Sequence, residues 1–255
     1  MRPTPAFTTT KPRAGDQTAV DAGLRAHMNR VFQEMATALG VSGVVAWVFG
    51  RDLAALRAGE PTSILPEGLL VALYTPPLSW VVMFAPLVAV MVLGFSMYKM
   101  APAKARMALY GFAALMGVSL ASIFAVFTGL SIASAFFATA AALAATSYYG
   151  YTTQRNLSAM GTFLIMGVVA LIVASIFNIF IGSSGLAFAV NIVAVLVFTA
   201  LMAYDTQRVK TDYLALRGAV GEDQLATMGT SGALSMYLNF VNVFISLLQI
   251  FGQRE

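Results

Sequence analysis

The sequence predicts an all-α integral membrane protein with seven transmembrane helices. Of its 255 residues, 59% are hydrophobic and only 10% are charged, and the mean hydropathy is +0.79. A soluble domain carries about 25% charged residues, which it needs to cover its surface. The apolar segments are continuous and show no strict alternation of apolar and polar residues, which excludes an outer-membrane β-barrel.

Long stretches without charge locate the membrane spans. A spanning helix needs about 20 apolar residues, so a window of nearly 50 residues holds two helices if a turn divides it. Five charge-free windows occur, at 35–50, 68–98, 107–154, 156–204 and 224–253. The third and fourth hold two helices each and the others hold one each, which gives seven.

Small and polar residues mark the turns inside the two long windows. The segments 128–131 (Thr-Gly-Leu-Ser) and 182–185 (Gly-Ser-Ser-Gly) are typical of tight turns. The first window is the shortest, and we expect its helix to begin near Arg25, with its first turns at the membrane surface. Residues 1–24 contain no apolar segment. They are expected to form a disordered cytoplasmic tail before a transmembrane domain at 25–255.

The distribution of basic residues predicts the orientation. Twelve of the 15 Lys and Arg residues precede the first helix or lie in connections on the same side, and three lie on the other side. Connections rich in Lys and Arg stay in the cytoplasm. The N-terminus is therefore predicted to be cytoplasmic, and seven spans place the C-terminus outside.

The third to sixth helices contain an internal repeat. A shift of 53 residues aligns 107–155 with 160–208 at 15 identical positions of 49. Because two spans separate the copies, the third and fourth helices would be related to the fifth and sixth by an axis along the membrane normal. The second copy gains polarity, since Ala125, Ala138 and Thr152 correspond to Asn178, Asn191 and Asp205.

Asp205 is the leading candidate for a functional residue. It lies near the end of the sixth helix, where the helix dipole disfavours a carboxylate. One interpretation is an interfacial side chain that pairs with Arg208. The other is an ionisable group that faces the bundle interior and binds a cation or a proton. Asn191 and Thr199 share its face of the helix.

The seventh helix presents a polar stripe toward that face. At 100° per residue its polar residues fall within an arc of roughly 80°. They are Ser231, Ser235, Asn239, Asn242, Ser246 and Gln249. The stripe indicates a helix that is buried among the others, where these side chains either line a pore or form hydrogen bonds between helices.

Several classes of protein are excluded or disfavoured. The chain has no cysteine, which rules out thiol catalysis. It lacks the sequence motifs of metalloproteases, serine hydrolases and nucleotide-binding pumps, so we expect no enzyme activity. No resident cofactor is expected, and the excess of basic residues reflects membrane topology, so we expect no nucleic-acid partner.

Particular motifs show a family resemblance. The chain resembles the Bax inhibitor-1, or transmembrane Bax-inhibitor-motif, family, and its bacterial members most. The motifs that carry this resemblance are Ala203 to Gln207, Ala233 to Phe244 with the closing Leu-Leu-Gln-Ile-Phe-Gly, Arg13 to Gly15, Ser147 to Thr153 and Asn178 to Phe180.

The resemblance implies six helices around a central seventh, and a pH-sensitive calcium leak in the inner (plasma) membrane of a bacterium. It implies a gate made of two aspartates, on the sixth and seventh helices, and a nearby basic residue. Asp205 matches the first aspartate and would be the calcium ligand, Asn239 replaces the second, and the basic position falls near Lys99. Asn242 lies on the same stripe.

Two close carboxylates share a proton and act as a pH switch, which Asp205 with Asn239 cannot do.

The sequence therefore predicts a calcium or cation leak channel in contact with the lipid bilayer, with weakened or shifted pH gating. The alternative is a regulatory membrane protein that binds and modulates a membrane-bound protease, through the N-terminal tail and the segment 210–229. A third hypothesis is a proton-coupled transporter of an organic substrate.

Overall fold

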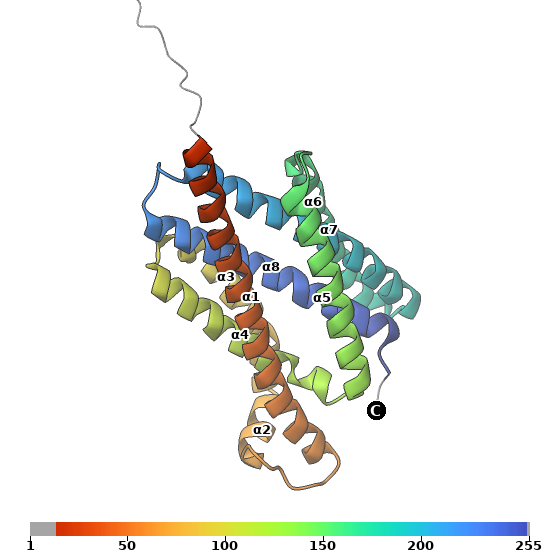
Figure 1. Ribbon diagram of the computed structural model, residues 1–255. Helices are drawn as coiled ribbons and strands as arrows, with labels where there is room; N and C mark the ends of the chain where they lie inside the picture. Colours follow the sequence, from red (N-terminus) through yellow and green to blue (C-terminus); the bar gives the residue numbers. More distant parts are fainter. Residues whose placement is uncertain (1–13, 254–255) are drawn as a thin grey trace, which may run out of the picture.

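The computed structural model describes residues 14–253, and this part of the chain contains α-helices and no β-strand (Figure 1). The elements are α1 (Ala14–Arg57), α2 (Glu67–Tyr74), α3 (Leu78–Ser96), the 3₁₀ helix η1 (Met97–Lys99), α4 (Pro102–Phe124), α5 (Gly129–Thr152), α6 (Ser158–Ile181), α7 (Ser184–Leu216) and α8 (Glu222–Phe251). All of the α-helices except α2 are long and apolar enough to cross a membrane. The predicted fold class, with seven spanning helices, is confirmed.

The first helix begins earlier than the sequence predicted. Residues 14–24 belong to α1, so the expectation of a disordered tail over 1–24 is wrong for this segment. The alanines of this segment favour helix. The helix is also anchored at the end of this segment, where Leu24 and Met28 are buried in the core. The rest of the predicted tail, 1–13, lies outside the described residues.

The two predicted turns are confirmed. Thr128 caps α5, where its hydroxyl accepts a hydrogen bond from the backbone N–H of Ser131. Gly182 ends α6 in the left-handed conformation, with φ of 65°, which glycine adopts without steric cost. Ser183 then caps α7 through the N–H of Leu186.

Two connections differ from the sequence interpretation. The window 68–98, expected as one span, is divided into α2 and α3 at Pro76 and Pro77, because proline lacks the N–H that a continuous helix needs. The segment 210–229, treated as a loop, is mostly helical. α7 continues to Leu216 and α8 begins at Glu222.

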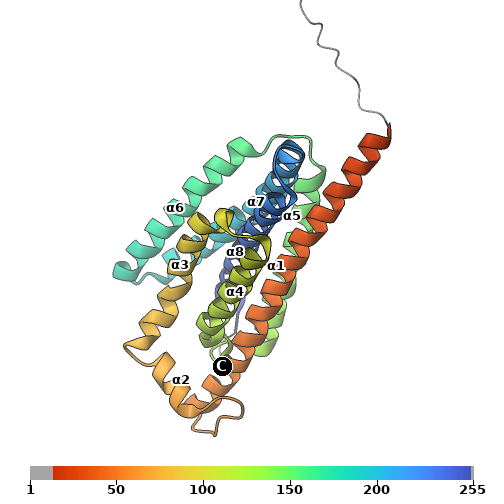
Figure 2. The same cartoon turned by 90° about the vertical axis from the view of Figure 1, so that its left-hand side faces the viewer.

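Helix α8 lies at the centre of the bundle. In its most apolar window, 56% of the residues are buried, against 28% or less in the other spanning helices. It packs against α1, α4, α5 and α7, whereas α3 packs mainly on α4 and α6 on α7. In Figure 2, α3 and α6 form the outer part of one side. α8 therefore has four spanning helices packed against it, and the expected ring of six helices around it stays a prediction.

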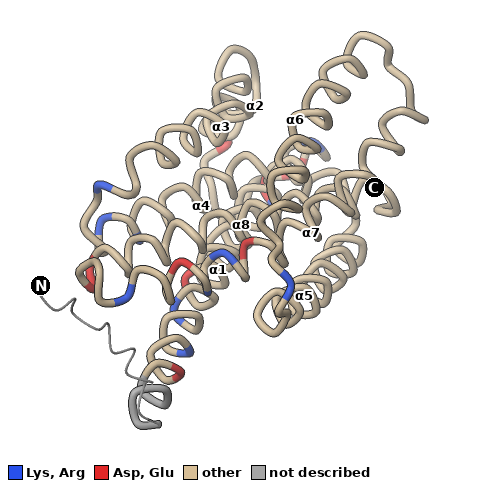
Figure 3. The backbone as a smooth tube through the Cα atoms, turned by 90° about the horizontal axis from the view of Figure 1, so that it is seen from above, with Lys and Arg blue, Asp and Glu red and all other residues tan. Residues whose placement is uncertain are grey.

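The described part of the chain begins and ends at opposite ends of the bundle, and its charges are unevenly distributed among the helices. The first described turn of α1 and the end of α8 lie at opposite ends of the bundle in Figure 1. α5 and α6 contain no charged residue, and the tube in Figure 3 shows charges mainly on α1 and near helix ends. α5 and α6 therefore present an uncharged surface, as helices in contact with lipid require.

The two copies of the internal repeat contact each other at one pair of corresponding residues, but their helix hairpins pack differently. α5 and α7 cross where Gly150 of the first copy faces Ala203, its counterpart in the second, and nearby Thr206 donates a hydrogen bond to Ser147 over 3.3 Å. The hairpins themselves differ, because α8 lies between α4 and α5 whereas α6 packs directly on α7. The parallel repeat stays a prediction.

We expect Gly150→Val to destabilise the protein by about 1–3 kcal/mol, the usual cost of overpacking a close contact. A Cβ atom at this position would collide with the carbonyl oxygen of Ala203 and crowd Thr206. Thermal unfolding in detergent measures the effect. Gly111→Val is the matched control, since a Cβ atom there meets nothing within 4 Å; equal melting temperatures for the two variants would contradict the prediction.

Candidate functional site at Asp205

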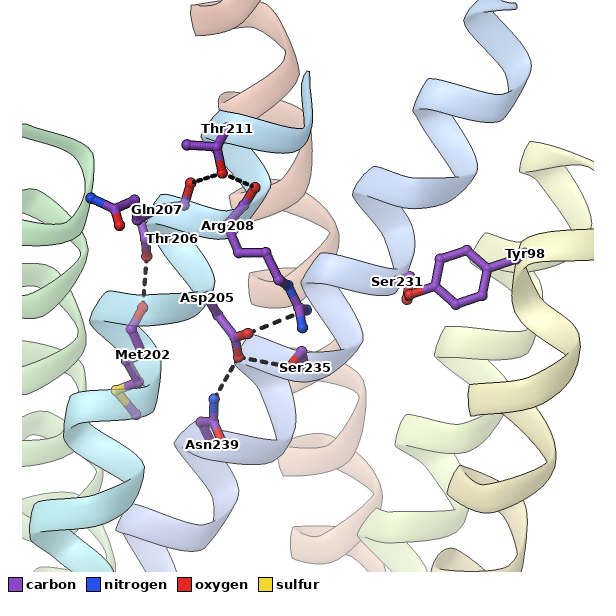
Figure 4. A network of polar contacts seen from close by, with 10 residues as sticks. All are labelled: Tyr98, Met202, Asp205, Thr206, Gln207, Arg208, Thr211, Ser231, Ser235 and Asn239. Carbon is purple, nitrogen blue, oxygen red and sulfur yellow. Dashed lines mark hydrogen bonds and ion pairs between the residues drawn. The ribbon is translucent and has the colours of Figure 1, made fainter. Parts of the chain in front are cut away.

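Asp205 lies in α7 with its side chain directed at the central helix α8 (Figure 4). Only 2% of its surface is exposed. The contact between α7 and α8 is close there, since a Cβ atom on Gly232 of α8 would collide with Val209 of α7. The carboxylate is thus held in a protein interior, where an ionised group needs partners.

Three side chains satisfy the carboxylate. Ser235 Oγ donates to Oδ2 over 2.6 Å, and Asn239 Nδ2 donates to the same oxygen over 2.7 Å. Arg208 Nη2 lies 3.2 Å from Oδ1. Ser235 and Asn239 are four residues apart and Arg208 is three residues beyond Asp205, so each pair shares one face of its helix. Figure 4 shows all three side chains converging on the carboxylate.

Arg208 connects this site to one end of the bundle. Its side chain is 35% exposed, and its guanidinium lies 5.8 Å from the ring centre of Tyr204. It also attracts Asp212, one turn further along α7. The residue lines a groove of about 680 Å³ together with Arg155 and Lys210, so its cation lies between the buried carboxylate and that groove.

Lys99 is not among the partners of Asp205. It lies in η1, and the basic side chain beside Asp205 is Arg208, because a residue three positions away on the same helix is already in reach. Arg106 also has a different partner, since its Nε lies 3.9 Å from Oε1 of Glu34 in α1. Glu34 is buried, and the sequence analysis assigned it no role.

Comparison with known proteins identifies the family. The family model described as "Inhibitor of apoptosis-promoting Bax1" matches residues 24–255. The chain belongs to the Bax inhibitor-1 family. An uncharacterised protein of Caulobacter vibrioides is 42% identical over 234 residues, covering 92% of this chain and 91% of that protein. Inner membrane protein YbhL of Escherichia coli is 35% identical over 252 residues, covering 96% and 98%.

In this Bax inhibitor-1 protein the rest of the polar stripe has several roles. Ser231 donates to the hydroxyl of Tyr98 over 3.0 Å, and Gln249 accepts from Asn191 Nδ2 over 3.0 Å. Asn242 donates to the backbone of its own helix at Leu238. The stripe therefore contacts α7 at Asp205 and at Asn191, and it contacts η1 at Tyr98.

The remaining candidate residues are buried or support local structure. Asn178 Oδ1 accepts from the N–H of Ser183 over 3.1 Å, so it stabilises the turn between α6 and α7. Ser246 is buried on α8. Thr199 Oγ1 is buried and has no hydrogen-bond partner among the described residues, at a level of α7 between Asn191 and Asp205.

No group of three or more His, Cys, Asp or Glu side chains converges within the described part of this family member. Calcium takes 6 to 8 oxygen ligands and prefers carboxylates. Asp205 offers one carboxylate, with the hydroxyl of Ser235 and the amide nitrogen of Asn239 beside it. This set is too small to bind calcium tightly.

Proposed function

We propose that this protein is a leak channel for calcium or related cations in the inner (plasma) membrane of a bacterium, with its N-terminus in the cytoplasm. The observation that carries the proposal is the ion pair of buried Asp205 with Arg208 at the central helix. Membrane proteins bury an ionisable group at high cost, and such groups mark ion or proton pathways. The bacterial inner membrane is suggested by the E. coli relative, which is named an inner membrane protein.

A series of polar groups supports a path along the contact between α7 and α8. It begins at Arg208 and Asp205, continues at Thr199, and ends at the pair of Asn191 with Gln249. Asp205 and Asn191 are separated by 14 helical residues, or about 21 Å at 1.5 Å per residue. That length covers most of a hydrocarbon core of about 30 Å.

Net charge at the site is the proposed control of flux. Asp205 contributes one negative charge and Arg208 one positive charge, so the site is neutral and the guanidinium occupies the place that a permeating cation needs. Flux requires Arg208 to move away, toward the groove and Asp212. Protonation of Asp205 leaves a net positive charge, so acid is expected to slow the leak.

The experiment that tests this function is calcium flux into liposomes that hold the purified protein, at pH 6 and pH 8. We expect flux above that of protein-free liposomes, and about fivefold less with Asp205→Asn, which removes the negative charge and leaves Arg208 to repel cations. Glu222→Gln, which removes an exposed charge in the first turn of α8, is the control and should retain most of the flux.

Flux that is absent at both pH values, or that is the same with and without Asp205, would overturn the proposal. The chain would then be examined as a regulator of a membrane-bound protease, by capture of that protease from membranes. Saturable uptake of an organic substrate driven by a proton gradient would favour a transporter.

A further inference from the structure

A large apolar cavity lies away from Asp205, between α1, α4, α5 and α8. Its volume is about 500 Å³, within the range of roughly 300–1,000 Å³ found for small-molecule sites. It exists because α1 and α5 both pack on other helices and barely on each other; in Figure 1, α8 is visible between them. Its aromatic walls include Trp47, Phe124, Phe136, Phe137, Phe240 and Phe244.

The cavity opens sideways, toward the surface that faces lipid. Trp47 on α1 is 50% exposed and Phe137 on α5 is 70% exposed, so the two sides of the opening are aromatic. The floor includes Phe240 and Phe244 of α8, and both side chains are buried. An apolar molecule from the membrane can therefore reach α8 here.

One end of the cavity carries a positive charge. Arg51, near the end of α1, is the charged residue of the lining, and its guanidinium lies 5.8 Å from the ring centre of Trp47. Within the described residues, Arg51 forms no ion pair. Arginine and tryptophan together are typical of the level of the lipid headgroups, where each keeps its polar part in water.

The neighbouring acidic residue does not neutralise this charge. Asp52 is fully buried and points into the loop after α1. Its two oxygens accept hydrogen bonds from Ser63 N and Oγ and from the N–H groups of Ile64 and Leu65, over 2.6 to 3.2 Å. The guanidinium of Arg51 therefore remains available to an anion from outside the protein.

We propose that this cavity binds an anionic phospholipid of the surrounding bilayer, with one acyl chain between α1 and α5 and the phosphate at Arg51. The shape of the ligand follows from the site, which is apolar along its length and cationic at the headgroup end. Guanidinium groups bind phosphate oxygens through two parallel hydrogen bonds. This inference does not depend on ion conduction by the protein.

Fluorescence quenching of Trp47 tests the proposal. The chain has two tryptophans, so Trp80→Phe leaves Trp47 alone. The protein is reconstituted in vesicles of phosphatidylcholine that contain a small fraction of either phosphatidylglycerol or phosphatidylcholine with brominated acyl chains. We expect the brominated phosphatidylglycerol to be about fivefold enriched at Trp47, which corresponds to about 1 kcal/mol for one basic residue at a lipid headgroup.

Variants separate the charge from the cavity. Arg51→Gln should abolish the preference for phosphatidylglycerol and Arg51→Lys should retain most of it. Gly43→Phe should also abolish it, because Gly43 lines the cavity and a Cβ atom there meets nothing within 4 Å, so the ring fills the space without collision. Gly40→Phe, on the same helix and equally free of contacts, is the matched control and should keep the preference.

Three results would overturn the inference. Equal quenching by the two brominated lipids would exclude selection of an anionic headgroup. A preference that survives Arg51→Gln would place its source elsewhere, and a preference that survives Gly43→Phe would mean that the lipid lies on the surface and does not enter the cavity. Thermal unfolding of each variant confirms that it is folded.

Discussion

Arg208→Gln is expected to raise calcium flux about tenfold, an effect that corresponds to about 1.4 kcal/mol. Arg208 Nη2 lies 3.2 Å from Asp205, and its removal changes the net charge of the site from zero to minus one. Asp205 keeps its hydrogen bonds from Ser235 and Asn239, so the carboxylate stays in place. A cation can then take the position that the guanidinium occupied. Flux in liposomes at pH 8 measures the change.

The same substitution is expected to destabilise the protein. Removing one partner of a buried ion pair costs roughly 3–5 kcal/mol, and we expect about 2 kcal/mol because the Arg208 side chain is 35% exposed and water already screens the pair. Combining Arg208→Gln with Asp205→Asn should recover most of this loss, since no unpaired charge remains, and should return flux to a low level.

Arg155→Gln is the control for Arg208→Gln. Arg155 lines the same groove, so its removal takes a positive charge from the same end of the bundle without touching Asp205. Unchanged flux in both variants would exclude Arg208 as the group that blocks the path. A tenfold rise in both would mean that the groove, and not the ion pair, controls cation entry.

The number of spanning helices and the central position of α8 could be predicted from the sequence because both depend on composition along one chain. Charge-free windows need only the length of a helix and the thickness of a membrane. The polar stripe from Ser231 to Gln249 needs only helical periodicity. These residues are indeed on the helix that contacts α1, α4, α5 and α7.

The partners within the site were harder to predict. The sequence placed Asp205 opposite the stripe, and the structure shows that Ser235 and Asn239 hold it while Asn242 bonds to its own backbone. Ser235, Asn239 and Asn242 lie at similar angles around the helix, so their angles alone do not tell which of them contacts Asp205. Arg208 was recognised as a possible neighbour of Asp205, but a choice between Arg208 and Lys99 requires the packing of α7, α8 and η1.

Features that depend on how far apart two helices lie cannot be predicted from the residues of either helix alone. The cavity beside Trp47 and Arg51 depends on the separation of α1 and α5, which are far apart in the sequence. The burial of Glu34 likewise depends on the approach of Arg106 from α4. The position of Glu34 beside a charge-free window was the one available signal, because a carboxylate next to a spanning segment needs a partner.

Asn239→Asp is expected to give the protein a steep response to pH. Asn239 Nδ2 lies 2.7 Å from Asp205 Oδ2, so the substitution places two carboxylates within hydrogen-bonding distance. Such a pair shares a proton when the solution is acidic and loses it as the pH rises. With Arg208 present, the site is neutral while the proton is held and carries one negative charge after it leaves. A neutral site passes few cations and a negative site admits more.

Flux through the Asn239→Asp variant should therefore be at least about fivefold higher at pH 8 than at pH 6, because a second carboxylate strengthens calcium binding. The ratio for the original chain should be clearly smaller than that of the variant. Asn242→Asp adds the same charge to α8 at a residue that bonds to Leu238 and not to Asp205, so its ratio should match that of the original chain. A pH response equally steep in both variants would show that any added charge on α8 suffices. A flat response in Asn239→Asp would mean that the charge next to Asp205 does not control flux.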